Sequence, residues 1–115
     1  MSYSLDATTR FTVRNGLTPV MYNSNDIVDE AHDEAAMQYM EVASGATDLT
    51  IPLGGLTTVE AIDLISDQAI SLKINGGTVA VGCKSLTLIG CAITALTVSN
   101  SSGALANLRI AMAGT

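Results

Sequence analysis

The chain has 115 residues, which is the size of one domain, and 48% of them are hydrophobic while only 14% are charged. With one Phe, three Tyr and no Trp, its core has to be built from aliphatic side chains and Met. A net charge of −6 disfavours a nucleic-acid-binding protein, which needs a basic surface.

Residues 1–35 differ in residue composition from the rest of the chain and are predicted to form an extended N-terminal arm with an acidic connector. RFTVRN, at 10–15, alternates as a strand does and is followed by a turn at Asn15-Gly16. The next segment, at 17–26, contains Pro19 and an Asn/Ser cluster and is predicted to be an extended connector. The chain opens with neither a basic stretch nor an apolar stretch, so no signal peptide is expected and synthesis in a cytoplasm follows.

The segment 26–43 leaves two alternatives open. A helix capped by Asp26 is one, and an acidic loop running into a strand at 36–43 is the other; the Ser44-Gly45 turn favours the strand. His32 lies among five acids in this segment, which could suggest a metal site or a general base. Because these side chains are all local, a solvated acidic segment is the preferred interpretation. The five acids are Asp26, Asp29, Glu30, Asp33 and Glu34.

Residues 36–115 are predicted to form one β-sandwich domain. Short β-branched segments with few charges are separated by turn residues every 8–12 positions, which is typical of a sandwich or a jelly-roll-like barrel. Asn75-Gly76-Gly77 indicates a hairpin, and Asn100–Gly103 is expected to join the last two strands as neighbours. The expected strands are TDLTIPL, TVEAIDLI, QAISLKIN, TVAVGC, SLTLIG, AITALTVS and LANLRIAM.

Alternation within these strands predicts which side chains form the core. Outward positions hold mostly Ala, Thr and Ser. A surface of such small, uncharged side chains suits packing against another subunit better than contact with water. The predicted core consists of Ile62, Leu64, Ile70, Leu72, Ile74, Leu86, Leu88, Leu96, Val98, Leu108 and Ile110.

The segment 76–100 has a single charge, Lys84, but polar residues and glycines interrupt it too often for a membrane-spanning helix. Cys83 and Cys91 are expected to be small hydrophobic residues without a disulfide. The two cysteines and His32 are too few for a zinc site, and neither a metal nor a cofactor is expected.

Candidate catalytic patterns have simpler structural explanations. Gly54-Gly55 lacks the lysine and the helix of a phosphate-binding loop and is predicted to be a turn. Asp63 and Asp67 could form a carboxylate pair, although a turn at Ser66-Asp67 is favoured. Neither a GxSxG motif nor a base beside a nucleophile occurs, so the protein is predicted not to be an enzyme. Core packing is the default expectation for the methionines Met21, Met37, Met40 and Met112.

Three segments, TDLTIPLGGLTT, AIDLISDQAISLKIN and ITALTVSNSSGALANLRIAMAG, occur in this order between Val42 and Gly114. They resemble small virion proteins of tailed bacteriophages; residues 1–35 do not contribute to the resemblance. It implies a non-enzymatic β-sandwich subunit, either a capsid decoration (cement) protein that binds the major capsid protein or a tail or baseplate component. It also implies a homo-oligomer, most simply a trimer, located in the virion after assembly in the host cytoplasm. From the net charge and the interrupted hydrophobic pattern, neither a nucleic-acid nor a membrane partner is expected. Because such proteins act through surfaces, the resemblance assigns no catalytic, cofactor or metal residues. A receptor- or carbohydrate-binding β module is the alternative from another class.

Overall fold

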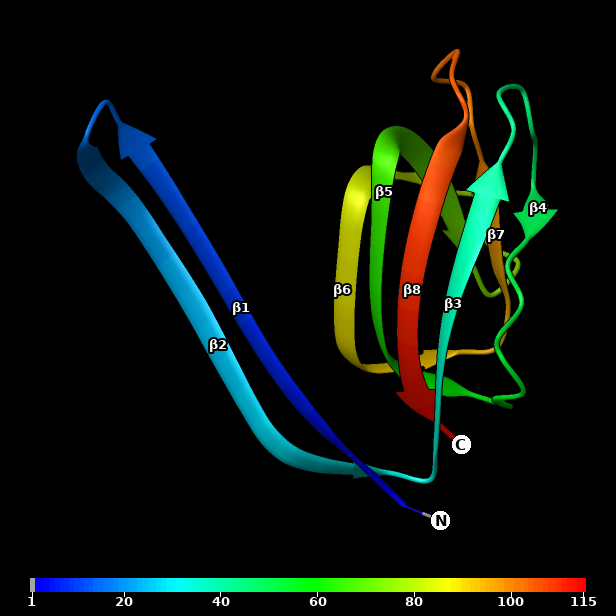
Figure 1. Cartoon of the computed structure of the whole chain (residues 1–115), viewed down its shortest axis with the longest axis horizontal. Helices are drawn as coiled ribbons and strands as arrows, with labels where there is room; N and C mark the ends of the chain where they lie inside the picture. The colour runs from blue at the N-terminus through cyan, green and yellow to red at the C-terminus, as the bar shows by residue number, and fades with distance from the viewer. Residues whose placement is uncertain (1) are drawn as a thin grey trace.

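Strands supply all the regular secondary structure in the computed structural model, which describes residues 2–115, the side chain of Val20 excepted (Figure 1). The described residues contain no helix, so the prediction of an all-β protein is confirmed. The strands are β1 (Tyr3–Asn15), β2 (Thr18–His32), β3 (Glu34–Val42), β4 (Leu49–Thr50), β5 (Val59–Ile74), β6 (Val81–Ile93), β7 (Leu96–Ser99) and β8 (Ala106–Gly114).

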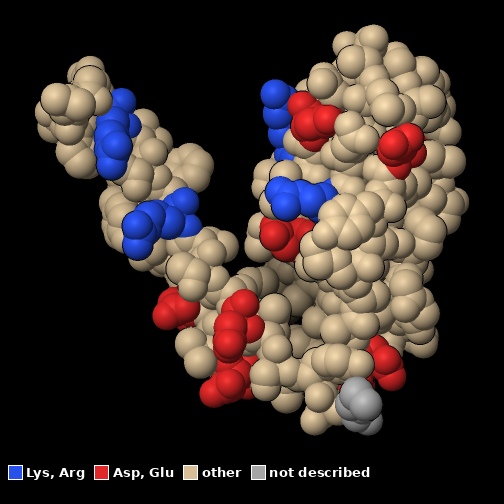
Figure 2. All heavy atoms as spheres, in the orientation of Figure 1, with Lys and Arg blue, Asp and Glu red and all other residues tan. Residues whose placement is uncertain are grey.

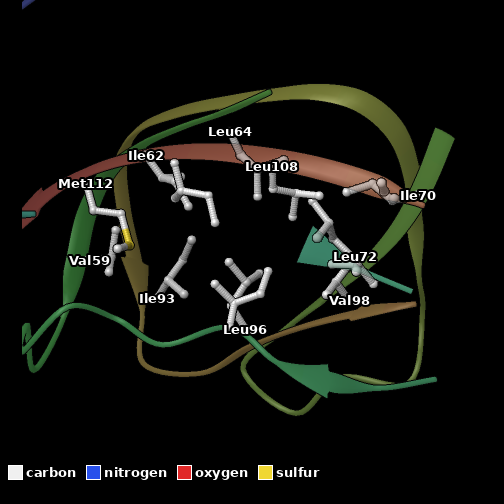
Figure 3. Close-up of a cluster of buried hydrophobic side chains, with 14 of the residues drawn as sticks. Val59, Ile62, Leu64, Ile70, Leu72, Ile93, Leu96, Val98, Leu108 and Met112 are labelled. Atoms are coloured by element: carbon white, nitrogen blue, oxygen red, sulfur yellow. The ribbon is translucent and has the colours of Figure 1, made fainter. Parts of the chain in front are cut away.

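The strands form two sheets of unequal size. β1 and β2 make an antiparallel hairpin that stands apart, while the other six strands pair in the order β3-β8-β5-β7-β4, with β6 also on β5. β5 is long and serves both halves of the large sheet: residues 59–66 pair with β8, and residues 71–74 pair with β7. The sheet therefore curls around its own inner face as a half-barrel (Figures 1 and 3).

The sequence Ser66-Asp67-Gln68 does not end a strand as predicted; it lies within β5. The pairing of β5 with β6 shifts register between Ile65 and Ile70, and the Ser66 hydroxyl bonds the backbone of Gln68. A bulge of this kind bends a strand without terminating it. In the same way, the expected break at Cys83-Lys84 and the one at Gly90-Cys91 both fall inside β6.

Three further expectations differ from the structure. The favoured strand at 36–43 is confirmed as part of β3, but neither a helix nor a loop precedes it, because β2 continues through the acidic residues to His32. β7 and β8 are also not neighbours: they pair with opposite halves of β5, so the turn at 100–105 crosses from one half of the sheet to the other. Of the segment TDLTIPL, only Leu49 and Thr50 form a strand.

The core lies inside the curl of the large sheet, lined by alternate side chains of each strand (Figure 3). Eight of the eleven predicted core residues are buried, and Ile74, Leu86 and Leu88 are partly buried against them. Alternation within the predicted strands did not extend to residues at strand ends or in connecting segments, where the period of two is lost. Met112 is buried as expected, and the core residues that were missed are Val42, Ile51, Leu56, Val59, Ile93 and Ala106.

Buried Asn100 ties the end of β3 to the turn between β7 and β8. Its side-chain amide donates to the carbonyl oxygens of Val42 (2.9 Å) and Ala104 (2.8 Å), and its Oδ1 accepts from the backbone N–H (3.1 Å) and the hydroxyl (2.7 Å) of Ser102. The side chain thus satisfies its full hydrogen-bonding capacity while fixing the end of β3 to the β7–β8 turn.

Candidate functional site: a hairpin arm and the cleft at its base

The β1–β2 hairpin projects from the half-barrel as an arm (Figure 1). Its strands are joined by a two-residue turn between Asn15 and Thr18, where Gly16 has a φ of 64°. The Cα radius of gyration of the chain is 15.4 Å, whereas about 13 Å is expected for a compact chain of this length. The difference reflects an arm that reaches away from the core and shares none of it.

One face of the arm is apolar and uncharged. Ala7 lines the cleft between the arm and the large sheet, and alternation along β1 puts Phe11 and Val13 on the same face as Ala7. Met21 lies directly opposite Val13 on β2. Phe11 is 65% exposed and Met21 is 64% exposed, so the single chain leaves this face largely uncovered. For Met21, the expectation of core packing was therefore wrong.

The opposite face of the arm is basic. Arg10 and Arg14 lie there with Tyr22, and residues 7–25 include no acid. The distal arm, defined as residues 7–25, therefore carries a net charge of +2. The rest of the chain contains all eleven acids and three basic residues, a net charge of −8. Figure 2 shows this separation, with basic side chains along the arm and acidic side chains at its base.

His32 holds the base of the arm against the large sheet. Its Nε2 lies 2.7 Å from Oε1 of Glu30 on β2, and its Nδ1 lies 3.4 Å from Oε1 of Glu60 on β5. The imidazole is buried, so His32 departs from the expected solvated acidic segment, whereas Asp26, Asp29, Asp33 and Glu34 are exposed. The sequence gives no signal for this contact, since Glu60 is 28 residues away along the chain.

The other acids at the base shape the hairpin itself. Asp6 accepts a hydrogen bond from the backbone N–H of Asp29 (2.9 Å), and Asp26 accepts one from the Thr8 hydroxyl (2.9 Å). Asp29 has a φ of 57°, and the β1–β2 register shifts at this point. These carboxylates are used locally, and no group of three or more His, Cys, Asp or Glu residues within the described part of the chain could hold a metal ion.

A cleft of about 190 Å³ separates the base of the arm from the large sheet. The arm contributes Tyr3, Leu5, Ala7 and His32 to its walls. The sheet contributes its outer face, meaning the alternate side chains of β3, β8, β5 and β6 that point away from the core. This outer face consists of Ala35, Met37, Tyr39, Arg109, Ala111, Ala113, Ala61, Asp63, Ile65, Ser85, Thr87 and Ile89.

The outer face has few charges and several uncovered apolar side chains. Met37 is 60% exposed, Tyr39 is 72% exposed and Ile65 is 39% exposed. Met37 therefore does not fill the core as expected, whereas Met112 is buried and Met40 packs partly against the core. Figure 2 shows the hollow between this face and the arm opening to solvent.

The two aspartates that could have formed a catalytic pair have separate structural partners. Asp63 accepts a hydrogen bond from the Thr87 hydroxyl (2.9 Å). Asp67 accepts from the backbone N–H and the side-chain amide of Asn107, both at 2.8 Å, and these bonds hold the pKa of Asp67 below its usual value. Each carboxylate thus ties neighbouring strands together.

The glycine pair and the cysteines also have structural roles. Gly54 and Gly55 form a turn with φ values of 63° and 88°, and Gly54 lies so close to Ala36 that a Cβ would clash with it. Cys83 and Cys91 are free thiols packed partly against the core, and burial raises the pKa of both. A raised pKa keeps a thiol protonated and unreactive at neutral pH.

Comparison with known proteins finds no family model, no curated protein and no solved structure that matches the chain. A search of the described residues for a helix long and apolar enough to cross a membrane finds none. The arm, the cleft and the outer face therefore carry the functional argument.

Proposed function

We propose that this protein is a non-enzymatic structural subunit of a tailed-bacteriophage virion, and that it decorates the capsid by binding the major capsid protein lattice. The observation that carries the proposal is the arm, which exposes Phe11, Leu17, Met21 and Tyr22. Exposed apolar side chains gathered in one place usually mark a surface that contacts another molecule. Leu17, at the tip, is 98% exposed. Apolar residues placed at the end of a projecting hairpin suit attachment to another protein.

The virion assignment comes from the sequence resemblance between Val42 and Gly114, and the arm supports an assembly role independently of it. The outer face, with its alanines and hydroxyl side chains, supports self-association, for which we propose a trimer. A repetitive shell multiplies modest contacts by avidity, so a small subunit needs no extensive interface with each shell protein.

Electron microscopy of the virion tests this function. The expected result is density for the half-barrel on the head, with the arm inserted between the subunits of the shell or of its own oligomer. Density confined to the tail would replace the capsid role by a tail role. Absence of the protein from purified particles would refute the proposal altogether.

Shortening the arm gives a complementary test. A variant in which residues 7–25 are replaced by a tight turn keeps His32, the core and the cleft base. It should fold normally but fail to co-sediment with the shell. Unchanged co-sedimentation would mean that the arm has no part in attachment or in the oligomer that attaches.

A further inference from the structure

The chain exposes more surface than a compact protein of its mass. Its accessible surface is 7000 Å², whereas a monomer of 11.8 kDa is expected to expose about 5,900 Å². The excess is about 1,100 Å², and a stable protein–protein contact buries about 800 Å² on each partner. The arm and the outer face both contribute to this excess, since both are uncovered and both contain exposed apolar side chains.

The two uncovered surfaces match each other in length. Residues 7–15 of β1 are nine residues long, and so is β8, which crosses the middle of the outer face. At about 3.3 Å per residue, both extend for about 30 Å. A distal arm can therefore lie along the whole outer face without overhanging it.

The surfaces also match in chemistry. The apolar face of the arm presents Phe11 and Met21, and the outer face presents Met37, Tyr39 and Ile65, all exposed. Among the charged groups, Asp63 lies on the outer face, and Glu41 lies at its edge on β3. Arg109 is a basic residue on the same face, and Arg10 and Arg14 lie on the opposite face of the arm, so the contact itself is matched by its apolar side chains. The net charges of +2 for the distal arm and −8 for the rest of the chain favour the approach of two copies at long range.

The chain's own arm does not close on its own outer face. It leaves the large sheet at the base cleft, where His32 bonds Glu30 and Glu60, and diverges from it toward the tip (Figures 1 and 2). The open hollow therefore needs an occupant from outside the chain, and the distal arm of a second copy has a matching length, matching apolar side chains and a net charge of opposite sign to the rest of the chain.

We propose that the distal arm of each subunit lies in the hollow between the arm and the outer face of a neighbouring subunit, so that the copies join arm-to-face in a closed ring. This inference rests on the self-association contained in the proposed function and identifies the surfaces that carry it. The contact is heterologous, because the arm of one copy meets a different surface on the next, and such contacts form rings when the rotation closes.

Two single substitutions test the two sides of the contact. Phe11→Asp puts a charge on the apolar face of the arm, and Tyr39→Asp puts one on the outer face. Because both side chains are mostly exposed in the single chain, each variant should keep the wild-type melting temperature and circular dichroism. Each should weaken self-association at least tenfold in sedimentation equilibrium.

The matched controls place the same charge elsewhere. Thr12→Asp changes the opposite face of β1, and Val79→Asp changes the segment between β5 and β6, which is exposed and contributes no residue to the outer face. Both controls should assemble like the wild type. Loss of assembly in the controls would mean that added charge alone disrupts the oligomer, and the arm-to-face contact would be rejected.

Mixing the two monomeric variants decides the geometry. The Tyr39→Asp chain retains an intact arm and the Phe11→Asp chain retains an intact outer face, so one contact per pair is restored. The mixture should form a one-to-one heterodimer and nothing larger. If the mixture stays monomeric, an intact arm and an intact outer face do not bind each other, which overturns the proposal.

The remaining outcomes separate the inference from the proposed function. If the wild type assembles while neither variant is weakened, the arm-to-face contact is wrong and the oligomer uses another surface. If the wild type is monomeric at tens of micromolar, the proposal of self-association is refuted, and the arm-to-face contact is refuted with it. Attachment to the shell is a separate proposal, which electron microscopy still tests.

Discussion

Replacing Asn100 by Ala should destabilise the half-barrel strongly. The side chain is 1% exposed and makes two donated and two accepted hydrogen bonds. Its loss leaves the carbonyl of Val42 without the partner that Asn100 provides, and each such loss costs about 1–3 kcal/mol. We expect the free energy of unfolding to fall by about 3 kcal/mol, out of a total of about 5–15 kcal/mol for a domain of this size.

Urea unfolding and calorimetry measure this effect. With an unfolding entropy of about 2.1 cal/mol/K per residue, 1 kcal/mol corresponds to about 4 °C for this chain, so the melting temperature should fall by about 12 °C. Ser101→Ala, an exposed change in the same turn, should have no measurable effect. Asn100→Asp keeps the shape but removes both donors, and should cost at least as much as the alanine. A loss below 1 kcal/mol in both Asn100 variants would refute the role assigned to this side chain.

Three other substitutions test the core, the arm base and the β5 bulge. Leu72→Asp puts an unpaired charge in the core and should unfold the subunit; near-wild-type melting would contradict the core assignment. His32→Ala should speed amide hydrogen exchange at the arm base several-fold, because it removes the contact with Glu60. The exposed control Asp33→Ala should leave exchange unchanged. Equal exchange rates in the two variants would show that the imidazole does not fix the arm base to the large sheet. The Asp67 carboxyl should titrate by NMR below 3.8, and Asn107→Ala should raise that midpoint. Because the folded-state pKa is lowered, the stability linked to Asp67 is present at neutral pH and is lost as pH falls through that pKa. An unchanged midpoint would exclude the side-chain amide of Asn107 as a cause.

The large sheet could be predicted from sequence because one of its faces is buried. A buried face imposes a strict alternation, which located residues such as Leu64 and Ile110 correctly. The ends of the strands were harder to predict from sequence. Ser and Asp are common in turns but also occur in β-bulges, as at Ser66-Asp67. Local sequence could not show that the strand would continue past it.

The arm was expected as an extended segment, but its pairing could not be seen in the sequence. Neither face of the hairpin is buried, so β2 needs no alternation and its Asn, Ser and Asp residues resemble a loop. The burial of His32 depends on Glu60, which comes from a distant strand, and the apolar face of the arm appears only when Val13 and Met21 are known to be paired. Tertiary contacts decided each of these features.

The arm needs stabilising contacts that the single chain does not provide. An isolated two-stranded hairpin is marginally stable in water, and each of its outer edges presents unpaired backbone groups. This hairpin has long strands of 13 and 15 residues and shares no core with the rest of the chain. Its order along the whole length therefore has to come from what covers it. A neighbouring surface that supplies apolar contacts to Phe11 and Met21 would stabilise the arm and bind the two copies by the same contacts.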